Sequence, residues 1–225
     1  MCDKINIKSQ AELFRKINQV IPLSVNRISI DIDIMVKIFI EKEQTMGKYS
    51  CVNQLGFVVP DLKEAMKLYG KIYGVKRWYH PVNKPAGESY FEGKPYNDPE
   101  FDIAIGYCGK TEIELIHVGK VDNLYSRFLK ERPAGGLHHI SFFVKDLDAW
   151  IEEYRQMGFE LSQNGVTNGR STKCRYAYMT RPEQGLGCIV EAAEMNMGKI
   201  TMGSRGAFSM WLGLFTGDTK RWRIK

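Results

Sequence analysis

Gly-Gly-Leu-His-His-Ile-Ser-Phe-Phe-Val, at residues 135–144, predicts a strand that a pair of glycines leads into. Side chains alternate between the two faces of a strand, so His139 shares a face with Ser141 and Phe143, whereas His138 points the other way. An imidazole at the start of a strand can bind a metal ion, act as a general base or pack in the core. Taken alone, this stretch favours a packed core histidine.

The same stretch occurs twice in the chain. A shift of 85 positions (139 minus 54) aligns residues 52–62 with residues 137–147. Phenylalanine then meets phenylalanine, valine meets valine, and one Asp-Leu pair meets the other. Gln54 falls on His139, so a polar side chain occupies the equivalent position in each copy.

A second match lies near the end of each copy. At a shift of 77 (191 minus 114), Glu-Ile-Glu-Leu-Ile of residues 112–116 aligns with Ile-Val-Glu-Ala-Ala of residues 189–193, which places Glu114 on Glu191. The shift becomes smaller because the first copy is longer in its middle. Two copies of one pattern predict a duplicated module with pseudo-twofold symmetry.

Each copy predicts a strand, a helix and three further strands, which makes the fold α+β. Asp61, with Glu64 placed for a capping box, begins the first helix, and Asp146 begins the second, which ends at Gly158. We expect two tandem βαβββ modules that form a curved, incompletely closed mixed sheet. The predicted segments are a first module at 46–120 with strands 52–59, 75–79, 101–108 and 111–118, a linker helix within 121–134, and a second module at 135–195 with strands 137–144, near 159, 175–180 and 188–193.

Two stretches inside the modules predict irregular structure. Residues 81–99 are polar and rich in Pro and Gly, which is typical of a long loop and often of a lid over a substrate. Residues 165–169 begin and end with glycine and predict a turn.

The two ends of the chain have no counterpart in the repeat. Within residues 1–45 we predict a helix at 11–21 and an alternating strand at 28–40, which form either an added edge strand or dimer arm, or a dispensable leader before Met46. The tail at 196–225 is rich in Met, Trp, Phe and basic residues. It could cover the site, join a dimer interface or lie on a membrane surface, and capping of the domain is the least demanding explanation.

The composition argues against nucleic-acid binding, secretion and membrane spanning. The 32 Lys and Arg residues against 26 Asp and Glu give a net charge of +6, and they are scattered along the chain. This distribution favours an anionic small ligand over nucleic acid. The five cysteines form no Cys-x-x-Cys pair, which favours a reducing, cytoplasmic location. Neither a secretion leader nor an apolar run long enough to span a membrane is present, so we expect no membrane association.

Pseudo-twofold packing of the modules brings four side chains together. Gln54 and Glu114 come from the first and last strands of one module, and His139 and Glu191 come from those of the other. An amide oxygen, an imidazole and two carboxylates suit a divalent ion such as Mn, Co, Ni, Zn or Mg. The alternative is that both glutamates are exposed strand residues, since their apolar neighbours occupy the opposite face.

The doubled pattern resembles the vicinal oxygen chelate (glyoxalase/bleomycin resistance) superfamily over about residues 50–195. Two motifs carry the resemblance, Val-Pro-Asp-Leu after the first strand and Ala-Gly-Gly-Leu-His-His-Ile before the second module. Residues 128–140 and Ile-Val-Glu at 189–191 are most similar to methylmalonyl-CoA epimerases. The family's metal-ligand positions fall on Gln54, Glu114, His139 and Glu191. The first ligand is usually His in the epimerases, and the order Gln, Glu, His, Glu resembles eukaryotic glyoxalase I.

The resemblance implies a metal-dependent epimerase or isomerase that shifts a proton next to a carbonyl through a metal-stabilised enediolate. Glu191 is the first candidate base, and Asp102 is a candidate acid/base for the opposite face of the substrate. Lys173 and Arg175 are candidate contacts for a coenzyme A phosphate or thioester tail. The implied substrate is an acyl-CoA or a glutathione thioester or hemithioacetal, and the resemblance also implies a homodimer.

Two alternatives follow from the same superfamily. A glyoxalase I-type lactoylglutathione lyase would share the metal ligands and differ in the substrate. A metal-free small-molecule binding protein of the bleomycin-resistance type would use the cleft between the modules without catalysis. The fold alone does not choose among these, because function depends on the site.

Overall fold

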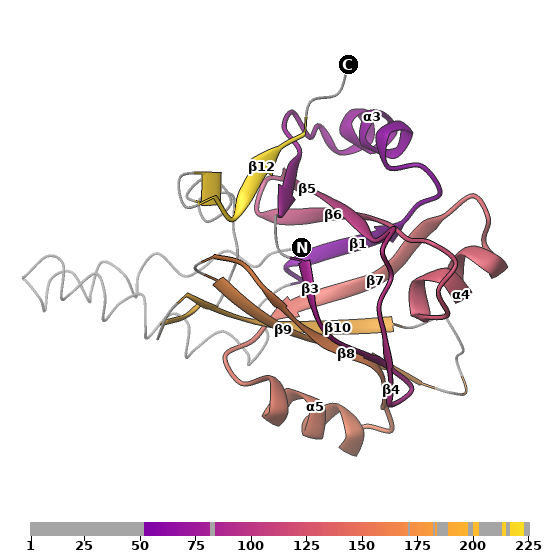
Figure 1. The fold of residues 1–225 in the computed structure, drawn as a ribbon, viewed down its shortest axis with the longest axis vertical. Helices are drawn as coiled ribbons and strands as arrows, with labels where there is room; N and C mark the ends of the chain where they lie inside the picture. Colours follow the sequence, from indigo (N-terminus) through magenta and orange to yellow (C-terminus); the bar gives the residue numbers. More distant parts are fainter. Residues whose placement is uncertain are drawn as a thin grey trace, which may run out of the picture. The chain divides into compact units, whose positions relative to one another are not determined.

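A computed structural model describes residues 52–81, 84–170, 172–181, 183, 189–197, 200–202, 213–214 and 217–222. The chain divides into two compact units, residues 1–50 and 51–225, and every described residue belongs to the second. The helix predicted at 11–21 and the strand predicted at 28–40 therefore lie outside the described residues. The fold of the second unit is drawn in Figure 1.

The strand, helix and three-strand order is present in both halves of this unit, which confirms the predicted α+β class. A helix, α4 (Leu124–Glu131), connects the halves where the linker helix is predicted. The first half contains β1 (Gln54–Val58), α3 (Leu62–Tyr73), β2 (Tyr79–Pro81), β5 (Asp102–Cys108) and β6 (Thr111–His117). The second half contains β7 (Gly136–Phe143), α5 (Leu147–Gln156), β8 (Glu160–Asn168), β9 (Thr172–Thr180) and β10 (Ile189–Met197).

The described strands form one curled, open mixed sheet, with β11 (Ile200–Met202) paired to β10. The order is β12-β2-β5-β6-β1-β7-β10-β9-β8-β3-β4, in which β3 is Lys84–Phe91, β4 is Lys94–Tyr96 and β12 is Thr219–Arg221. The first strands of the two halves, β1 and β7, lie side by side and antiparallel. Each is parallel to the last strand of its own half, β1 to β6 and β7 to β10. The pseudo-twofold axis therefore passes between β1 and β7, and the four strands that carry the predicted ligands are adjacent.

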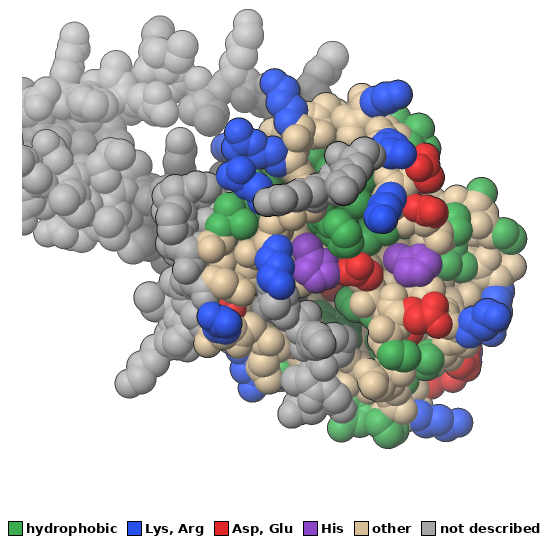
Figure 2. Space-filling view, turned by 45° about the horizontal axis from the view of Figure 1, so that its top comes forward, with side chains coloured by type: hydrophobic (Ala, Val, Ile, Leu, Met, Phe, Trp, Pro, Cys, Tyr) green, Lys and Arg blue, Asp and Glu red, His purple; other side chains and the backbone are tan. Residues whose placement is uncertain are grey.

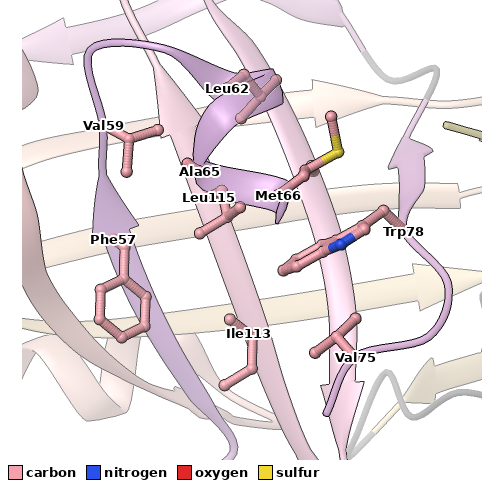
Figure 3. Packing of buried hydrophobic residues seen from close by; sticks show 10 residues of the cluster. Phe57, Val59, Leu62, Ala65, Met66, Val75, Trp78, Ile113 and Leu115 are labelled. Atoms are coloured by element: carbon pink, nitrogen blue, oxygen red, sulfur yellow. The ribbon is translucent and has the colours of Figure 1, made fainter. Parts of the chain in front are cut away.

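Helix α3 covers one face of the first half of the sheet. The side chain of Asp61 accepts a hydrogen bond from the backbone N–H of Glu64 at 2.9 Å, and Gly74 ends the helix in the left-handed conformation with φ of 68°. Figure 3 shows the apolar side of this helix against strand residues that include Ile113 and Leu115. Because side chains alternate along β6, residues 112, 114 and 116 point to the opposite face, where the site lies.

Helix α5 repeats this arrangement on the second half. Asp146 accepts a hydrogen bond from Ala149 N–H at 3.0 Å, as the predicted N-cap requires. Trp150 is buried and stacks on Tyr154, with ring centroids 4.0 Å apart. Gly158 follows the helix with φ of 85°, so both predicted helix ends are confirmed.

The stretch at 81–99, predicted not to be regular throughout, contains a β-hairpin and, within the described residues, is irregular only outside its strands. It contains β3 (Lys84–Phe91) and β4 (Lys94–Tyr96), and β3 pairs with β8 of the second half. The predicted turn at 165–169 is wrong for its first residues, since β8 continues to Asn168. A Cβ on Gly165 would lie 2.6 Å from the Tyr176 hydroxyl, so this glycine permits a close approach within the sheet and makes no turn.

The predicted second strand at 75–79 begins later, at Tyr79, because Val75 and Trp78 pack into the core beneath α3. The outer edge of β2 is covered by β12 (Thr219–Arg221), which comes from the tail. Trp222 extends this contact, since its backbone N–H donates to the carbonyl of Trp78 at 3.0 Å. The described part of the tail therefore caps the sheet.

The surface agrees with a scattered distribution of basic residues. On the face drawn in Figure 2, Lys and Arg side chains surround acidic and histidine side chains. Within the described residues, none of the helices combines the length and the apolar character that a membrane span requires. Cys108 and Cys174 are free cysteines.

Candidate metal centre

The register of the four central strands brings the predicted ligands together. Across β6, β1 and β7, Glu114 pairs with Gly56, and Gly56 pairs with His139. Two residues along β1, Gln54 pairs with Glu112 on one side and with Ser141 on the other. Ser141 in turn pairs with Glu191 on β10. All four predicted ligands therefore occupy two neighbouring rows of one small area of the sheet.

Gly56 makes room for the imidazole of His139. A Cβ at this position would lie 1.9 Å from Cε1 and 2.1 Å from Nε2 of that ring, which no side chain can tolerate. The ring therefore lies directly over the backbone of β1. Residue 56 must be glycine for His139 to reach the two glutamates.

Glu114, His139 and Glu191 form a compact, buried group. Nε2 of His139 lies 3.2 Å from Oε2 of Glu191 and 3.6 Å from Oε2 of Glu114. The possible ligand atoms of the three residues all lie within 4.8 Å of one another. The imidazole is completely buried, and each glutamate side chain is at most one tenth exposed. The alternative of exposed strand glutamates is therefore excluded.

His138 fixes the orientation of His139. The pairing between β1 and β7 is irregular at this point, since Gly56 pairs with His139 and the next residue pairs with Leu137. His138 is the extra residue of this bulge, so simple alternation does not describe it. Its Nδ1 lies 2.9 Å from Nδ1 of His139, a hydrogen bond that needs one N–H and one bare nitrogen. A proton on Nδ1 of His139 leaves Nε2 with a free lone pair toward the carboxylates.

The surroundings of this group keep Glu191 charged and His138 neutral at pH 7. Burial, with a smaller contribution from His139, holds the pKa of His138 well below its usual value, so His138 is neutral at pH 7. Burial acts to raise the pKa of Glu191, but His139 and neighbouring hydrogen-bond donors together lower it below its usual value. Glu191 is therefore an ionised carboxylate at neutral pH.

These residues fit a divalent metal ion. Nε2 of His139 is buried and makes no hydrogen bond of good geometry, although two carboxylates flank it. A buried polar atom without a hydrogen bond carries a large free-energy penalty, and a cation held jointly with the carboxylates removes it. One nitrogen and two carboxylate ligands suit Mn, Co, Ni or Zn. Gln54 lines the same cavity as both glutamates and can add an amide oxygen.

The cavity over this group has an aromatic wall. Ser89 of the β3–β4 hairpin takes part in it, with Oγ 3.0 Å from the Tyr176 hydroxyl, so the first half of the chain closes the cavity of the second. Tyr125 donates a hydrogen bond to the Tyr178 hydroxyl at 2.9 Å. Burial raises the pKa of these tyrosines, so their hydroxyls stay protonated. The aromatic lining residues are Tyr96, Phe101, Tyr125, Phe143, Tyr176 and Tyr178.

The structure does not bring Asp102 to the candidate metal centre. Ile103 lines the cavity, so the preceding residue points to the other face of β5. The Asp102 carboxylate lies 3.0 Å from Nδ1 of His80 and is about one third exposed. Arg175 is likewise away from the cavity, with ion pairs to Asp148 at 2.6 Å and Glu194 at 3.4 Å. Lys173 lies on the same face of β9 as Arg175, which is the face opposite to the cavity-lining residues of that strand.

Sequence reasoning missed Glu112. This glutamate is buried, with 1% of its surface exposed, and it accepts a hydrogen bond from Nε2 of Gln54 at 2.7 Å. Its spacing of two residues from Glu114 is the signal that could have placed it on the same face of β6. The repeat does not reveal it, because its counterpart in the second copy is Ile189.

The fold and the buried Glu-His-Glu group define a class of protein. Residues 53–178 match the family model of the Glyoxalase/Bleomycin resistance protein/Dioxygenase superfamily. This match covers more than half of the chain, and the chain belongs to that superfamily.

Several proteins that the chain resembles are epimerases. The chain is 24% identical over 146 residues to an ethylmalonyl-CoA/methylmalonyl-CoA epimerase of Cereibacter sphaeroides, covering 64% of this chain and 97% of that one. It is 29% identical over 98 residues to a mitochondrial methylmalonyl-CoA epimerase of Dictyostelium discoideum, covering 43% and 50%. The chain thus spans about half the length of this mitochondrial relative. A solved methylmalonyl-CoA epimerase from Mycobacterium tuberculosis has a TM-score of 0.45 at 19% identity, covering 65% and 88%.

Proposed function

We propose that this protein is a divalent-metal-dependent epimerase that shifts a proton next to the carbonyl of an acyl-CoA thioester. The observation that carries the proposal is the Glu114, His139 and Glu191 group at one end of a cavity with an aromatic wall. In this group Nε2 of His139 faces carboxylate oxygens of Glu191 and Glu114, at 3.2 and 3.6 Å. Three ligand atoms of the kinds that bind divalent ions therefore converge in one buried place.

In the proposed site, Glu114, His139, Glu191 and the amide oxygen of Gln54 hold the metal ion. When bound, a divalent ion supplies Lewis-acid stabilisation of negative charge on the oxygens of the substrate. The carboxylate of Glu191 removes the proton from the carbon next to the carbonyl, and its lowered pKa keeps it ionised for this step. Glu114, its counterpart in the other half of the site, returns a proton to the opposite face of that carbon in this proposal, which completes the epimerisation. The tyrosines of the wall exclude water and offer hydroxyl donors to the substrate. Asp102 has no role in this proposal, because it lies on the opposite face of β5.

The substrate class rests on the relatives. Those that the chain resembles in sequence are named for methylmalonyl-CoA and ethylmalonyl-CoA, both acyl-CoA thioesters with an acidic C–H next to the carbonyl. At 24% identity the exact acyl group is part of the proposal. The predicted homodimer and cytoplasmic location stay predictions.

A second candidate, a glyoxalase I-type lyase, is favoured by one observation. The first ligand position holds Gln54 in place of the histidine usual in the epimerases, and Gln54 lines the cavity beside both glutamates. A glutathione hemithioacetal would offer the same pair of oxygens to the metal as a thioester substrate does.

Proton exchange distinguishes these functions. Methylmalonyl-CoA is incubated in D2O with protein loaded with Co²⁺ or Mn²⁺, and loss of the α-proton signal is followed by NMR. The epimerase proposal predicts rapid exchange, its loss in Glu191→Ala and its retention in the control Asp102→Asn. A parallel assay with methylglyoxal and glutathione measures lyase activity. Metal-loaded protein that exchanges no α-proton but forms lactoylglutathione would contradict the epimerase and support the lyase.

A further inference from the structure

We infer that Glu112 is a positioning residue for the metal centre, which holds the amide of Gln54 so that its oxygen remains free to bind the ion. This inference rests on the proposed metal-dependent function and extends it to a residue outside the ligand set. The observation is one buried carboxylate that joins two side chains, Gln54 and Tyr107, through short hydrogen bonds.

The hydrogen bond to Glu112 determines which way the amide nitrogen and the amide oxygen of Gln54 point. Nε2 of Gln54 donates to Oε1 of Glu112 at 2.7 Å. The donor in this bond is the amide nitrogen, so the nitrogen faces Glu112 and the amide oxygen faces away from it. Without such a partner, a glutamine amide can present either its nitrogen or its oxygen to a neighbour, and only the oxygen binds a cation.

Glu112 is itself held in place. The Tyr107 hydroxyl donates to its other carboxylate oxygen, Oε2, at 2.7 Å. Tyr107, Glu112 and Gln54 are register partners on three adjacent strands, β5, β6 and β1. The row of hydrogen bonds therefore runs along the sheet toward the cavity, and little freedom remains for the Gln54 side chain.

The two halves of the site orient their first-strand ligands through different residues. In the second half the first-strand ligand is His139, and its orientation is set by His138 through the Nδ1 contact of 2.9 Å. In the first half the equivalent ligand is Gln54, and Glu112 takes the orienting role. Position 189, the counterpart of Glu112, holds isoleucine, whose side chain has no hydrogen-bonding atom.

The test is a double-mutant cycle read out as metal affinity. Isothermal titration calorimetry with Co²⁺ alone measures the dissociation constant for the parent, Glu112→Gln, Gln54→Ala and the double variant. Outer-shell substitutions at metal sites weaken binding by about 10- to 100-fold, and we expect a loss of this size for Glu112→Gln. In the Gln54→Ala background the same substitution should change the affinity by less than about twofold, because no amide remains to be oriented.

Each outcome of the cycle decides one question. An equal loss from Glu112→Gln in both backgrounds would mean that Glu112 acts on the fold in general, which contradicts the inference. Unchanged affinity in Glu112→Gln would contradict the inference and leave the proposed function standing. A parent protein that binds no Co²⁺ would overturn the proposed function and this inference with it. Glu112→Asp, which keeps the charge and withdraws it by one methylene, replaces Glu112→Gln if that variant does not fold.

Discussion

The imidazole of His139 lies directly over the backbone of Gly56, where a Cβ would be 1.9 Å from Cε1 of the ring. The two residues are register partners on β7 and β1, the first strands of the two halves. The pseudo-twofold axis passes between these strands. The candidate metal centre therefore lies at the junction of the repeats, and the place of His139 in it depends on the absence of a side chain at residue 56.

Gly56→Ala should displace the His139 ring and weaken Co²⁺ binding at least about tenfold, with a loss of about 1–3 kcal/mol in unfolding free energy from overpacking. Calorimetric titration and urea unfolding measure the two effects. The matched control is Gly70→Ala in α3, where a Cβ meets neighbours at 3.4 Å and beyond. This control should bind metal normally and gain about 0.5–1 kcal/mol, because glycine is unfavourable within a helix. Normal metal binding by Gly56→Ala would show that the ring has another way to reach the carboxylates.

The buried side of α3 can be tested within one turn of the helix. Met66 is 1% exposed and packs in the cluster of Figure 3, whereas Leu68 is 56% exposed. Met66→Ala should lower the unfolding free energy by about 2–5 kcal/mol, and Leu68→Ala should change it by less than about 0.5 kcal/mol. Chemical denaturation of both variants measures this difference. Similar losses for the two would contradict the described orientation of the helix.

The equivalent N-caps of the two halves should contribute equally. Asp61 and Asp146 each accept a backbone N–H three residues on, at 2.9 and 3.0 Å. Each substitution to Ala should cost about 1 kcal/mol of stability, and the losses should add in the double variant because the helices lie in different halves. Thermal or urea unfolding measures them. A cap without effect would show that the helix end is held by other contacts.

The β3–β4 hairpin should be fixed to the second half through Ser89 and Tyr176. Their hydroxyls lie 3.0 Å apart, so Tyr176→Phe should cost about 0.5–1.5 kcal/mol. The double variant with Ser89→Ala should lose less than the sum of the single variants, since both remove the same hydrogen bond. Tyr90→Phe, on an exposed residue of the same hairpin, is the control and should be neutral within about 0.5 kcal/mol. Full additivity would mean that the two hydroxyls do not interact.

The repeat made much of this structure predictable from the sequence. Two copies of a strand, a helix and three strands determine which strands become neighbours, and this places Gln54, Glu114, His139 and Glu191 together. The two-residue turn at Gly109 also determines the pairing of β5 with β6, since Cys108 then meets Thr111 and Ile105 meets Glu114. Asp102 could have been assigned to the opposite face from that register alone.

Other features could not be predicted, because they depend on contacts between segments distant in sequence. The β3–β4 hairpin pairs with β8 of the other half, and a polar stretch rich in Pro and Gly carries no signal of such a partner. Gly165 lies within β8 because Tyr176 packs over it, which a local pattern cannot distinguish from a turn. The bulge at His138 likewise arises from the pairing of β7 with β1 and not from the sequence of β7.

The most direct test of the metal centre is a metal titration of the purified protein beside Glu191→Ala. The parent, stripped with a chelator and titrated with Mn²⁺, Co²⁺, Ni²⁺ or Zn²⁺, should bind about one ion per chain, and the variant should lose this binding while its circular dichroism spectrum stays that of the parent. Failure of the parent to bind any of these ions, or equal binding by Glu191→Ala, would contradict the metal centre. The first of these results would favour a metal-free binding protein.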